Sequence, residues 1–201
     1  MKKVFLSLVA LATFGFANAQ IKEKGTIEIT PKIGASSFGE FNGNDNSDYN
    51  AGVELGATVD YYFNNRWSLR SGLIADKMGS KNQFAGNFYE DELNYLSIPL
   101  NANWHFGSTR KWNLNFGLSP SFLTSAKFNE NANTTDIPES AIESFQLGFT
   151  YGIGYKIGIN DKFGILIDAQ FFNGLTNINK ASQERIVNGG YSFNLGGVIQ
   201  L

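Results

Sequence analysis

The sequence predicts an all-β protein of eight antiparallel strands in up-and-down order, and three observations support this prediction. Apolar and polar residues alternate with a period of two in eight separate segments. The connections between these segments are alternately long and short. The 201 residues include 22 Gly and 18 Phe, while charged residues make up only 17% of the chain, against about 25% in ordinary soluble domains.

The alternation is clearest in the segment 144–159. Apolar side chains occupy every odd position from Phe145 to Ile159, and Ser, Gln, Gly, Thr or Lys occupies each even position. Successive side chains of a strand point to opposite faces, so this segment is a strand with one apolar face. No segment has a convincing helical period of 3.6 residues. The other seven predicted strands are approximately 26–36, 50–63, 67–79, 93–106, 112–124, 163–175 and 190–201.

The lengths of the connections make the prediction more specific. Because long and short connections alternate, all the short turns lie at one end of the sheet. Small outer-membrane barrels have this arrangement, with short periplasmic turns and longer extracellular loops. We therefore predict an eight-stranded antiparallel up-and-down transmembrane β-barrel rather than a soluble sandwich. The short connections are 64–66, 107–111 and 160–162, and the long polar ones are about 37–49, 80–92, 125–143 and 176–189.

The N-terminus predicts export. Two lysines follow the first Met, an apolar run covers 4–16, and a small-x-small pattern (Ala-Asn-Ala) comes next. This order is typical of a secretory signal peptide, and the apolar run is too short to span a membrane as a helix. We expect cleavage between Ala19 and Gln20, which divides the chain into a signal peptide, 1–19, and a barrel domain, 20–201. The alternative is a first core helix. The sequence has no Cys, which excludes a lipid-anchored lipoprotein, disulfides and a cysteine nucleophile.

The polar face of the predicted strands carries charges of both signs. The interior of an eight-stranded barrel is just wide enough for side chains to fill it, and charges buried there must be paired. Assigning the polar face to the outside would expose apolar stripes to water. We therefore predict a plugged polar lumen with a charge network of Glu28, Lys32, Glu54, Asp60, Arg70, Asp76, Lys156 and Asp168.

Aromatic residues flank the short turns on the apolar face. Tryptophan and other amphipathic rings concentrate where the hydrocarbon of a membrane meets the headgroups. The alternative is that these rings form the core of a soluble barrel. Their position at the turn end favours an aromatic belt formed by Phe63, Trp67, Trp104, Phe106, Trp112 and Phe163.

Three short motifs resemble those of a known family. The run Tyr95–Leu100 (YLSIPL) resembles the Y-L-x-I-P-L strand of the PorT-type outer-membrane β-barrel family, often labelled porin-family proteins. Phe116–Pro120 (FGLSP) is similar to the strand that follows it there, and Gly174–Ile178 (GLTNI) to the end of the seventh strand. The resemblance covers the whole predicted barrel domain. It departs at Leu201, where barrel-assembly signals usually end in an aromatic residue. The resemblance implies a location in the outer membrane of Gram-negative bacteria without fixing an activity.

Residues that could carry chemistry are scarce. His105 is the only histidine and falls on the predicted lumen face, where we expect a hydrogen-bonded structural role; a metal site or catalytic triad needs further convergent groups. Pro99 is expected at a kink in the barrel wall. The segment 42–48 has oxygen ligands at alternate positions, as calcium loops do, but Tyr49 and Leu55 stand where such loops need Gly and Glu. We therefore expect no catalytic residues, no cofactor and no metal.

The predicted long loops are acidic, with 11 Asp and Glu against 4 Lys and Arg over 36–50, 80–92, 125–143 and 176–188. Such loops could bind divalent cations or a basic partner, although solvated loops are commonly polar without a ligand. A net charge of −2 gives no electrostatic footprint for nucleic acid. Expected partners are outer-membrane lipid, the barrel-assembly machinery during insertion and an unidentified extracellular or envelope protein.

These observations predict a non-enzymatic outer-membrane protein with a structural or interaction role in the cell envelope. A narrow porin-like channel for ions or small solutes is the alternative. An outer-membrane enzyme is a third interpretation, but it requires a catalytic cluster at the extracellular rim, and the sequence shows none.

The export signal gives the first testable prediction. We expect protein purified from cell envelopes to begin at Gln20, because signal peptidase cleaves after the small-x-small pattern. The intact mass measured by mass spectrometry checks this. A mass that still includes residues 1–19 would contradict it.

Overall fold

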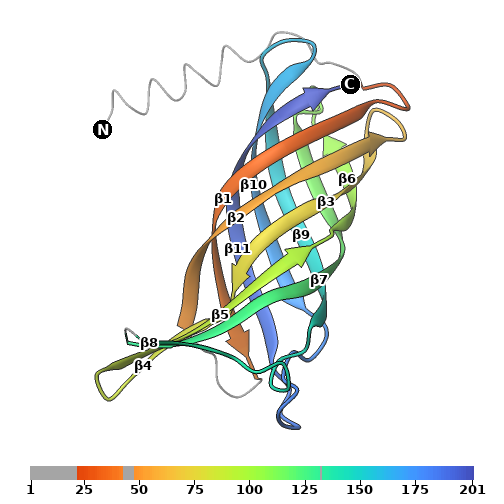
Figure 1. The fold of residues 1–201 in the computed structure, drawn as a ribbon. Helices are drawn as coiled ribbons and strands as arrows, with labels where there is room; N and C mark the ends of the chain where they lie inside the picture. Colours follow the sequence, from red (N-terminus) through yellow and green to blue (C-terminus); the bar gives the residue numbers. More distant parts are fainter. Residues whose placement is uncertain (1–21, 43–47, 132) are drawn as a thin grey trace, which may run out of the picture.

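A computed structural model of the chain describes residues 22–42, 48–131 and 133–201 (Figure 1). The predicted signal peptide, with Ala19 and Gln20, lies outside the described residues, as does most of the calcium-like segment 42–48. Among the described residues, no helix is long and apolar enough to cross a membrane.

The described part of the chain contains eleven β-strands, all paired in antiparallel ladders of one sheet. The prediction of an all-β, antiparallel, up-and-down protein is therefore confirmed. The strands are β1 (Ile27–Phe41), β2 (Asp48–Tyr62), β3 (Trp67–Met78), β4 (Ser80–Phe84), β5 (Asn87–Ser97), β6 (Leu100–Phe106), β7 (Trp112–Glu130), β8 (Asn133–Asp136), β9 (Phe145–Gly158), β10 (Phe163–Gly174) and β11 (Val187–Gln200).

The ladders form a continuous circuit. From β1 the ladders lead to β2 and then to β3. Strand β3 pairs with both β5 and β6, and these two pair with β7. The ladders then continue through β9 and β10 to β11. The last of these strands, β11, pairs with β1 over most of its length, for example Ile33 opposite Leu195. Figure 1 shows these strands wrapped around a common axis, with the C-terminus at the same end as the short turns. The circuit leaves no unpaired edge between its first and last strands.

Asparagine side chains shape two of the short turns. The Asn64 Oδ1 atom accepts hydrogen bonds from the backbone N–H groups of Arg66 and Trp67. The Asn160 Oδ1 atom accepts from Lys162 and Phe163 in the same way. An Asn side chain that bonds the backbone two and three residues later stabilises a tight turn. These local bonds explain why β2–β3 and β9–β10 reverse within a few residues.

The predicted strand 93–106 is interrupted, and this is one reason why the strand count differs from eight. It is divided into β5 and β6 at Ile98 and Pro99, because proline has no N–H to donate to a ladder. The Ile98 N–H still donates to the carbonyl oxygen of Pro120, at 2.9 Å. Both β5 and β6 pair with the same neighbours, β3 and β7.

Two of the predicted long loops contain additional strands, and this corrects their assignment as loops. Segment 80–92 forms the hairpin of β4 and the start of β5, and segment 125–143 includes the end of β7 and β8. These strand segments pair into an extension of the sheet, which Figure 1 shows projecting sideways from the long-loop end. The β4–β5 turn places Ala85 at φ 51° and Gly86 at φ 85°, as a tight two-residue hairpin turn requires. Sequence alternation missed these strands because neither of their faces packs against a core.

The circuit carries apolar side chains on its outside, while polar side chains predominate among the buried residues. Ladder hydrogen bonds need no particular side chains, so the alternation alone decides which surface each residue reaches. In a soluble protein these apolar side chains would contact water, at a free-energy cost of about 25 cal/mol per Å² of exposed apolar surface. Outward-facing residues that are more than half exposed include Ile33, Leu55, Leu73, Ile167, Phe193 and Leu195.

The outer face gives a second testable prediction. Ile153 is 41% exposed near the middle of β9 on this face. Replacing it with Arg should lower the free energy of unfolding in lipid vesicles by about 2–4 kcal/mol, because a charge would then face the centre of the bilayer. Denaturant titrations of vesicle-inserted protein measure the cost.

Ile159 provides the matched control, because it lies on the same face beyond the end of β9 and is 56% exposed. Arg at that position should cost only about 0–1 kcal/mol, as expected near the interface. Equal costs at Ile153 and Ile159 would show that the outer face does not contact hydrocarbon.

Candidate functional site

The interior of the circuit is the candidate functional site, and its central layer is built around Arg70. The guanidinium of Arg70 on β3 donates to both carboxylate oxygens of Asp60, with Nη2 3.1 Å from Oδ2 and Nε 3.3 Å from Oδ1. Asp60 lies directly opposite Arg70 in the β2–β3 ladder. On the other side, Arg70 Nη1 is 3.7 Å from Oδ2 of Asp168 on β10. One arginine thus joins two carboxylates from different parts of the circuit.

Neutral side chains complete the central layer. Asp60 Oδ1 also accepts hydrogen bonds from Ser68 Oγ, at 2.9 Å, and from Asn103 Nδ2, at 2.8 Å. Asp60 and Asn103 are fully buried, and Arg70 is only 3% exposed. The bidentate contact with Arg70 and these additional hydrogen bonds to Asp60 are all charge-assisted. They compensate for the loss of hydration of the buried ions.

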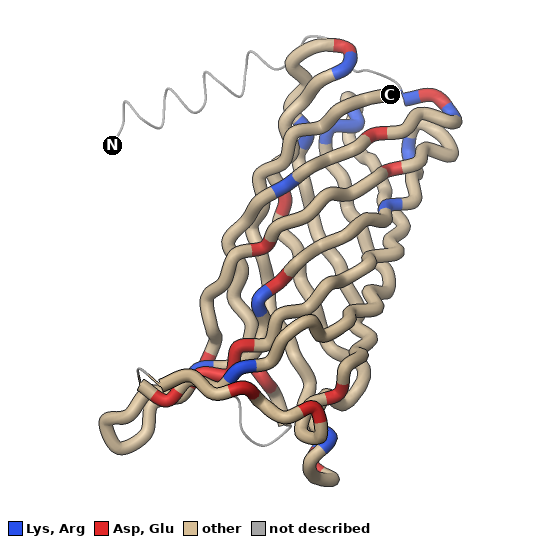
Figure 2. The backbone as a smooth tube through the Cα atoms, viewed as in Figure 1, with Lys and Arg blue, Asp and Glu red and all other residues tan. Residues whose placement is uncertain are grey.

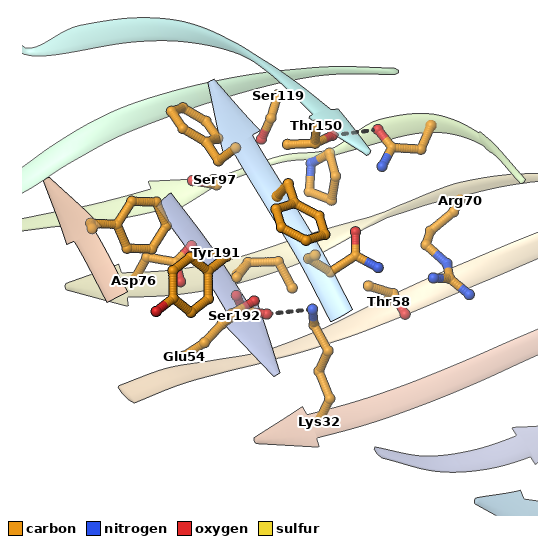
Figure 3. Close-up of a pocket in the computed structure, with 17 residues that line it drawn as sticks. Lys32, Glu54, Thr58, Arg70, Asp76, Ser97, Ser119, Thr150, Tyr191 and Ser192 are labelled. Carbon is orange, nitrogen blue, oxygen red and sulfur yellow. Dashed lines mark hydrogen bonds and ion pairs between the residues drawn. The ribbon is translucent and has the colours of Figure 1, made fainter. Parts of the chain in front are cut away.

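A second layer lies on the long-loop side of Arg70. Lys32 on β1 forms an ion pair with Glu54 on β2, and both side chains are buried. Asp76 on β3 stands directly opposite Glu54 in the ladder. The Asp76 Oδ1 atom is buried and has no hydrogen-bond partner among the described residues. Lys32, Glu54 and Asp76, labelled in Figure 3, line a small cavity. Its volume of about 60 Å³ is enough for a few water molecules.

The third layer lies at the short-turn end. Glu28 on β1 accepts ion-pair contacts from two lysines: Lys22, with Nζ 3.1 Å from Oε1, and Lys156 on β9, through Oε2. Tyr62 on β2 donates its hydroxyl to Glu28 Oε2 at 2.8 Å and accepts from Lys156 Nζ at 2.9 Å. The Tyr62 ring stacks on His105, with centroids 4.8 Å apart. The structure therefore distributes the eight charges of the predicted network over three layers.

His105 lies close to a serine and an aspartate, but the hydrogen bonds do not form a catalytic relay. Ser68 Oγ is 2.9 Å from His105 Nε2 and donates its proton to Asp60. The hydroxyl hydrogen is therefore not available to His105, which must donate to Ser68 instead of acting as its base. In a triad the carboxylate orients the histidine, whereas here it binds the serine directly. All three side chains are buried.

The long-loop end of the interior is apolar, a feature that the sequence analysis missed. Its buried side chains form an apolar plug, and Gln146 Nε2 contacts the sulfur of Met78 at 3.2 Å beside it. The sequence did contain a signal for the plug. Its members on strands are apolar residues at inward-facing positions, which are polar elsewhere on the same strands. Ile178 comes from the β10–β11 connection and shows no such signal. The plug consists of Phe38, Met78, Leu93, Tyr95, Phe172 and Ile178.

The predicted aromatic belt lies on the outer surface around the short turns. Trp67 stacks on Trp104 with ring centroids 6.3 Å apart, and Trp104 on Phe106 at 5.0 Å. Phe106 and Trp112 continue this row from β6 to β7, with ring centroids 6.3 Å apart. Phe163 on β10 is 41% exposed. Phe63 is 49% exposed and contacts Tyr61, with ring centroids 5.5 Å apart.

A second group of aromatic residues lies towards the long-loop end, where sequence reasoning named none. The rings of Tyr151 and Phe171 stack with their centroids 5.1 Å apart, and the ring centroids of Phe171 and Tyr191 are 6.5 Å apart. Tyr191 in turn contacts Phe193 and Tyr49. Membrane barrels carry aromatic girdles at both interfaces. The sequence signal was weaker here because the residues are Tyr and Phe rather than Trp.

Metal and cofactor sites were not expected from the sequence. Within 22–42, 48–131 and 133–201, no group of three His, Asp or Glu side chains is arranged to hold a metal ion. Between its central layer and the apolar plug, the interior holds a cavity of about 60 Å³.

Comparison with known proteins places these features in context. A family model described as outer membrane protein beta-barrel domain matches residues 15–180. No curated protein matches the chain.

Two solved structures illustrate the similarity of fold. Neisserial surface protein A has a TM-score of 0.53 at 9% identity, over 88% of this chain and 99% of its own. Ail of Yersinia pestis, crystallised with the heparin analogue sucrose octasulfate, has a TM-score of 0.51 at 16% identity, over the same shares of the two chains. At these identities the similarity concerns the fold alone.

The central layer gives a third testable prediction. Replacing Arg70 with Ala should lower the free energy of unfolding by about 3–5 kcal/mol, because Asp60 and Asp168 would be left as buried, unpaired charges. Adding Asp60→Asn to this variant should recover part of the loss, since one uncompensated charge is removed.

Lys77→Ala is the matched control on the same strand. Lys77 pairs with Glu90 at 2.8 Å, but both side chains are about a quarter exposed, and such pairs contribute about 0–1 kcal/mol. Unfolding titrations in vesicles compare the variants. A loss for Arg70→Ala no larger than for Lys77→Ala would mean that the central layer is not a tightly coupled network.

Proposed function

The chain belongs to the outer membrane protein beta-barrel domain family, and from this premise we propose that it is a non-conducting transmembrane barrel with a structural or interaction role in the cell envelope. The observation that carries the proposal is the reversed distribution of side chains. Apolar residues cover the outside of a closed circuit of strands, while buried ion pairs occupy much of its interior. A bilayer is the solvent that favours this distribution.

The barrel we propose has eight membrane-spanning strands. Strands β5 and β6 count as one interrupted strand because they share both neighbours, β3 and β7. Strands β4 and β8 belong to the sideways extension and stand outside the circuit. An even number of antiparallel strands is the rule for single-chain bacterial outer-membrane barrels.

The orientation we propose places the short turns in the periplasm and the long loops outside the cell. Short periplasmic turns and long extracellular loops are the general pattern of such barrels. The cleaved signal peptide and the closer relation to PorT-type proteins belong to the same proposal. They rest on the N-terminal pattern and on the three motifs Tyr95–Leu100, Phe116–Pro120 and Gly174–Ile178.

Three layers of charge and an apolar plug support the absence of conduction. An ion entering from the long-loop end would meet Phe38, Met78 and Phe172, which expose between 0% and 6% of their surface. It would then meet the Lys32–Glu54 pair and the Arg70 layer. A narrow apolar constriction excludes water, and displaced ion pairs oppose passage. The channel alternative rests on the small internal cavity and on a larger one at the short-turn end.

An enzymatic role is less well supported. The His105–Ser68–Asp60 contacts have the wrong donor order for catalysis, and the three residues are buried. Interaction through the sideways extension is better supported, because its tip exposes 75% of Phe84 and 48% of Phe88. Exposed aromatic residues of this kind are common in protein contacts. The partner we propose is an extracellular or envelope protein.

Conductance gives the fourth testable prediction. We expect purified protein in planar bilayers to show no steady current at neutral pH, because side chains fill the interior. The variant in which Arg70 and Lys156 are both replaced by Ala should open small, flickering currents, since it removes cations from two of the three layers. Lys77→Ala, outside those layers, is the matched control and should stay silent. Robust ohmic channels from the unmodified protein would overturn the proposal and favour the pore.

A further inference from the structure

A cavity of about 330 Å³ opens at the short-turn end of the circuit. Its floor is the layer around Glu28, and its walls come from the ends of β9 and β11, the start of β10 and the turns that follow β6 and β9. We call this cavity the vestibule. It lies on the opposite side of the central layer from the small internal cavity, because Arg70 lines the internal cavity and His105 lines the vestibule.

The vestibule is strongly basic. Five basic residues line it, against the two acidic residues Glu28 and Asp161. The whole chain has the opposite balance, with a net charge of −2, and Figure 2 shows Lys and Arg gathered around this end. The basic lining residues are Lys22, Arg110, Lys111, Lys156 and Lys162.

The floor of the vestibule places two lysines beside one carboxylate. The single carboxylate of Glu28 contacts two ammonium groups, those of Lys22 and Lys156. Lys156 is further held by the Tyr62 hydroxyl and lies 5.4 Å from the centroid of the Tyr62 ring. These contacts fix the position of Lys156 at the floor of the vestibule.

Two further cations stand at the rim. The Arg110 Nε atom is buried and has no hydrogen-bond partner among the described residues. Lys162 forms no ion pair with any residue that the structure describes. Between the rim and the floor, Gly158 lines the vestibule, and a Cβ added there would meet no atom within 4 Å. The space beside these cations is therefore open.

We propose that the vestibule binds a small multivalent oxyanion carrying phosphate or carboxylate groups. Its volume of about 330 Å³ is within the size range of small-molecule sites. Arginine and lysine around a partly enclosed space form charge-assisted hydrogen bonds with such oxygens. The buried Nε of Arg110 is a donor that lacks an acceptor among the described residues. This binding function goes beyond the proposed structural role, and its test does not depend on the orientation in the membrane.

Isothermal titration calorimetry of the full barrel in phosphatidylcholine nanodiscs tests the proposal, with inorganic phosphate and citrate as probes. We expect saturable binding that weakens as sodium chloride is added, because salt screens charges near the surface. Arg110→Gln and Lys162→Gln should each weaken binding by about three- to tenfold, as loss of one partly exposed charged hydrogen bond implies. Lys162→Arg should retain binding.

Lys81→Gln and Lys127→Gln, which lie in the sideways extension at the other end, are the matched controls and should leave binding unchanged. Circular dichroism confirms that each variant is folded. The absence of binding of both probes, or an equal loss in the control variants, would overturn the proposal. Repeating the titration in nanodiscs with phosphatidylglycerol separates two sources of the same chemistry. Competition by this lipid assigns the vestibule to lipid headgroups, and unchanged binding assigns it to soluble anions.

Discussion

The pairing of β1 with β11 is the interaction on which the rest of the structure depends. In a bilayer no water is available to satisfy a free sheet edge, so every backbone group of a spanning strand must find its partner within the protein. Closing the circuit, for example at Ile33 and Leu195, removes that edge. It also fixes one face of every strand towards a narrow interior and the other towards the surroundings. The alternation that identifies the strands is a consequence of this closure.

The narrow interior explains why its charges occur in layers. A lone Arg or Asp there would lose most of its hydration, so each charged side chain has to lie close to one of opposite charge. Arg70 meets this requirement with Asp60 on the neighbouring strand β2 and Asp168 on the distant strand β10, and Lys156 does so with Glu28. Glycines make room for the neutral side chains that support these layers; a Cβ at Gly152 would lie only 2.4 Å from the amide of Gln170. The layers tie the register of one strand to that of others far along the chain.

Sequence alternation predicted the strands of the circuit well because the membrane-facing surface imposes a strict period of two, as in β9. It also placed Glu28, Asp60 and Arg70 on one face. It failed where that constraint ends. The strands β4 and β8 have solvent on both faces, so no alternation marks them. The apolar plug combines strand residues such as Phe38 with Ile178 from a connection, and only the folded loops bring them together. The contact of Arg70 with Asp168 could not be predicted, because the register across the circuit depends on pairings between distant strands.

The two ends of the barrel differ in charge as well as in loop length, and this difference bears on what the protein can do. The long loops are acidic, the adjacent interior is apolar, and the vestibule at the other end is basic. A cation attracted by the loops would meet the apolar plug, then the layers around Lys32 and Arg70, and finally the basic vestibule. An anion attracted by the vestibule would meet the buried carboxylates of Asp60 and Asp168. Neither sign of charge finds a continuous favourable path, because each attraction is followed by a layer that opposes it. The arrangement therefore favours separate binding at the two ends over passage between them.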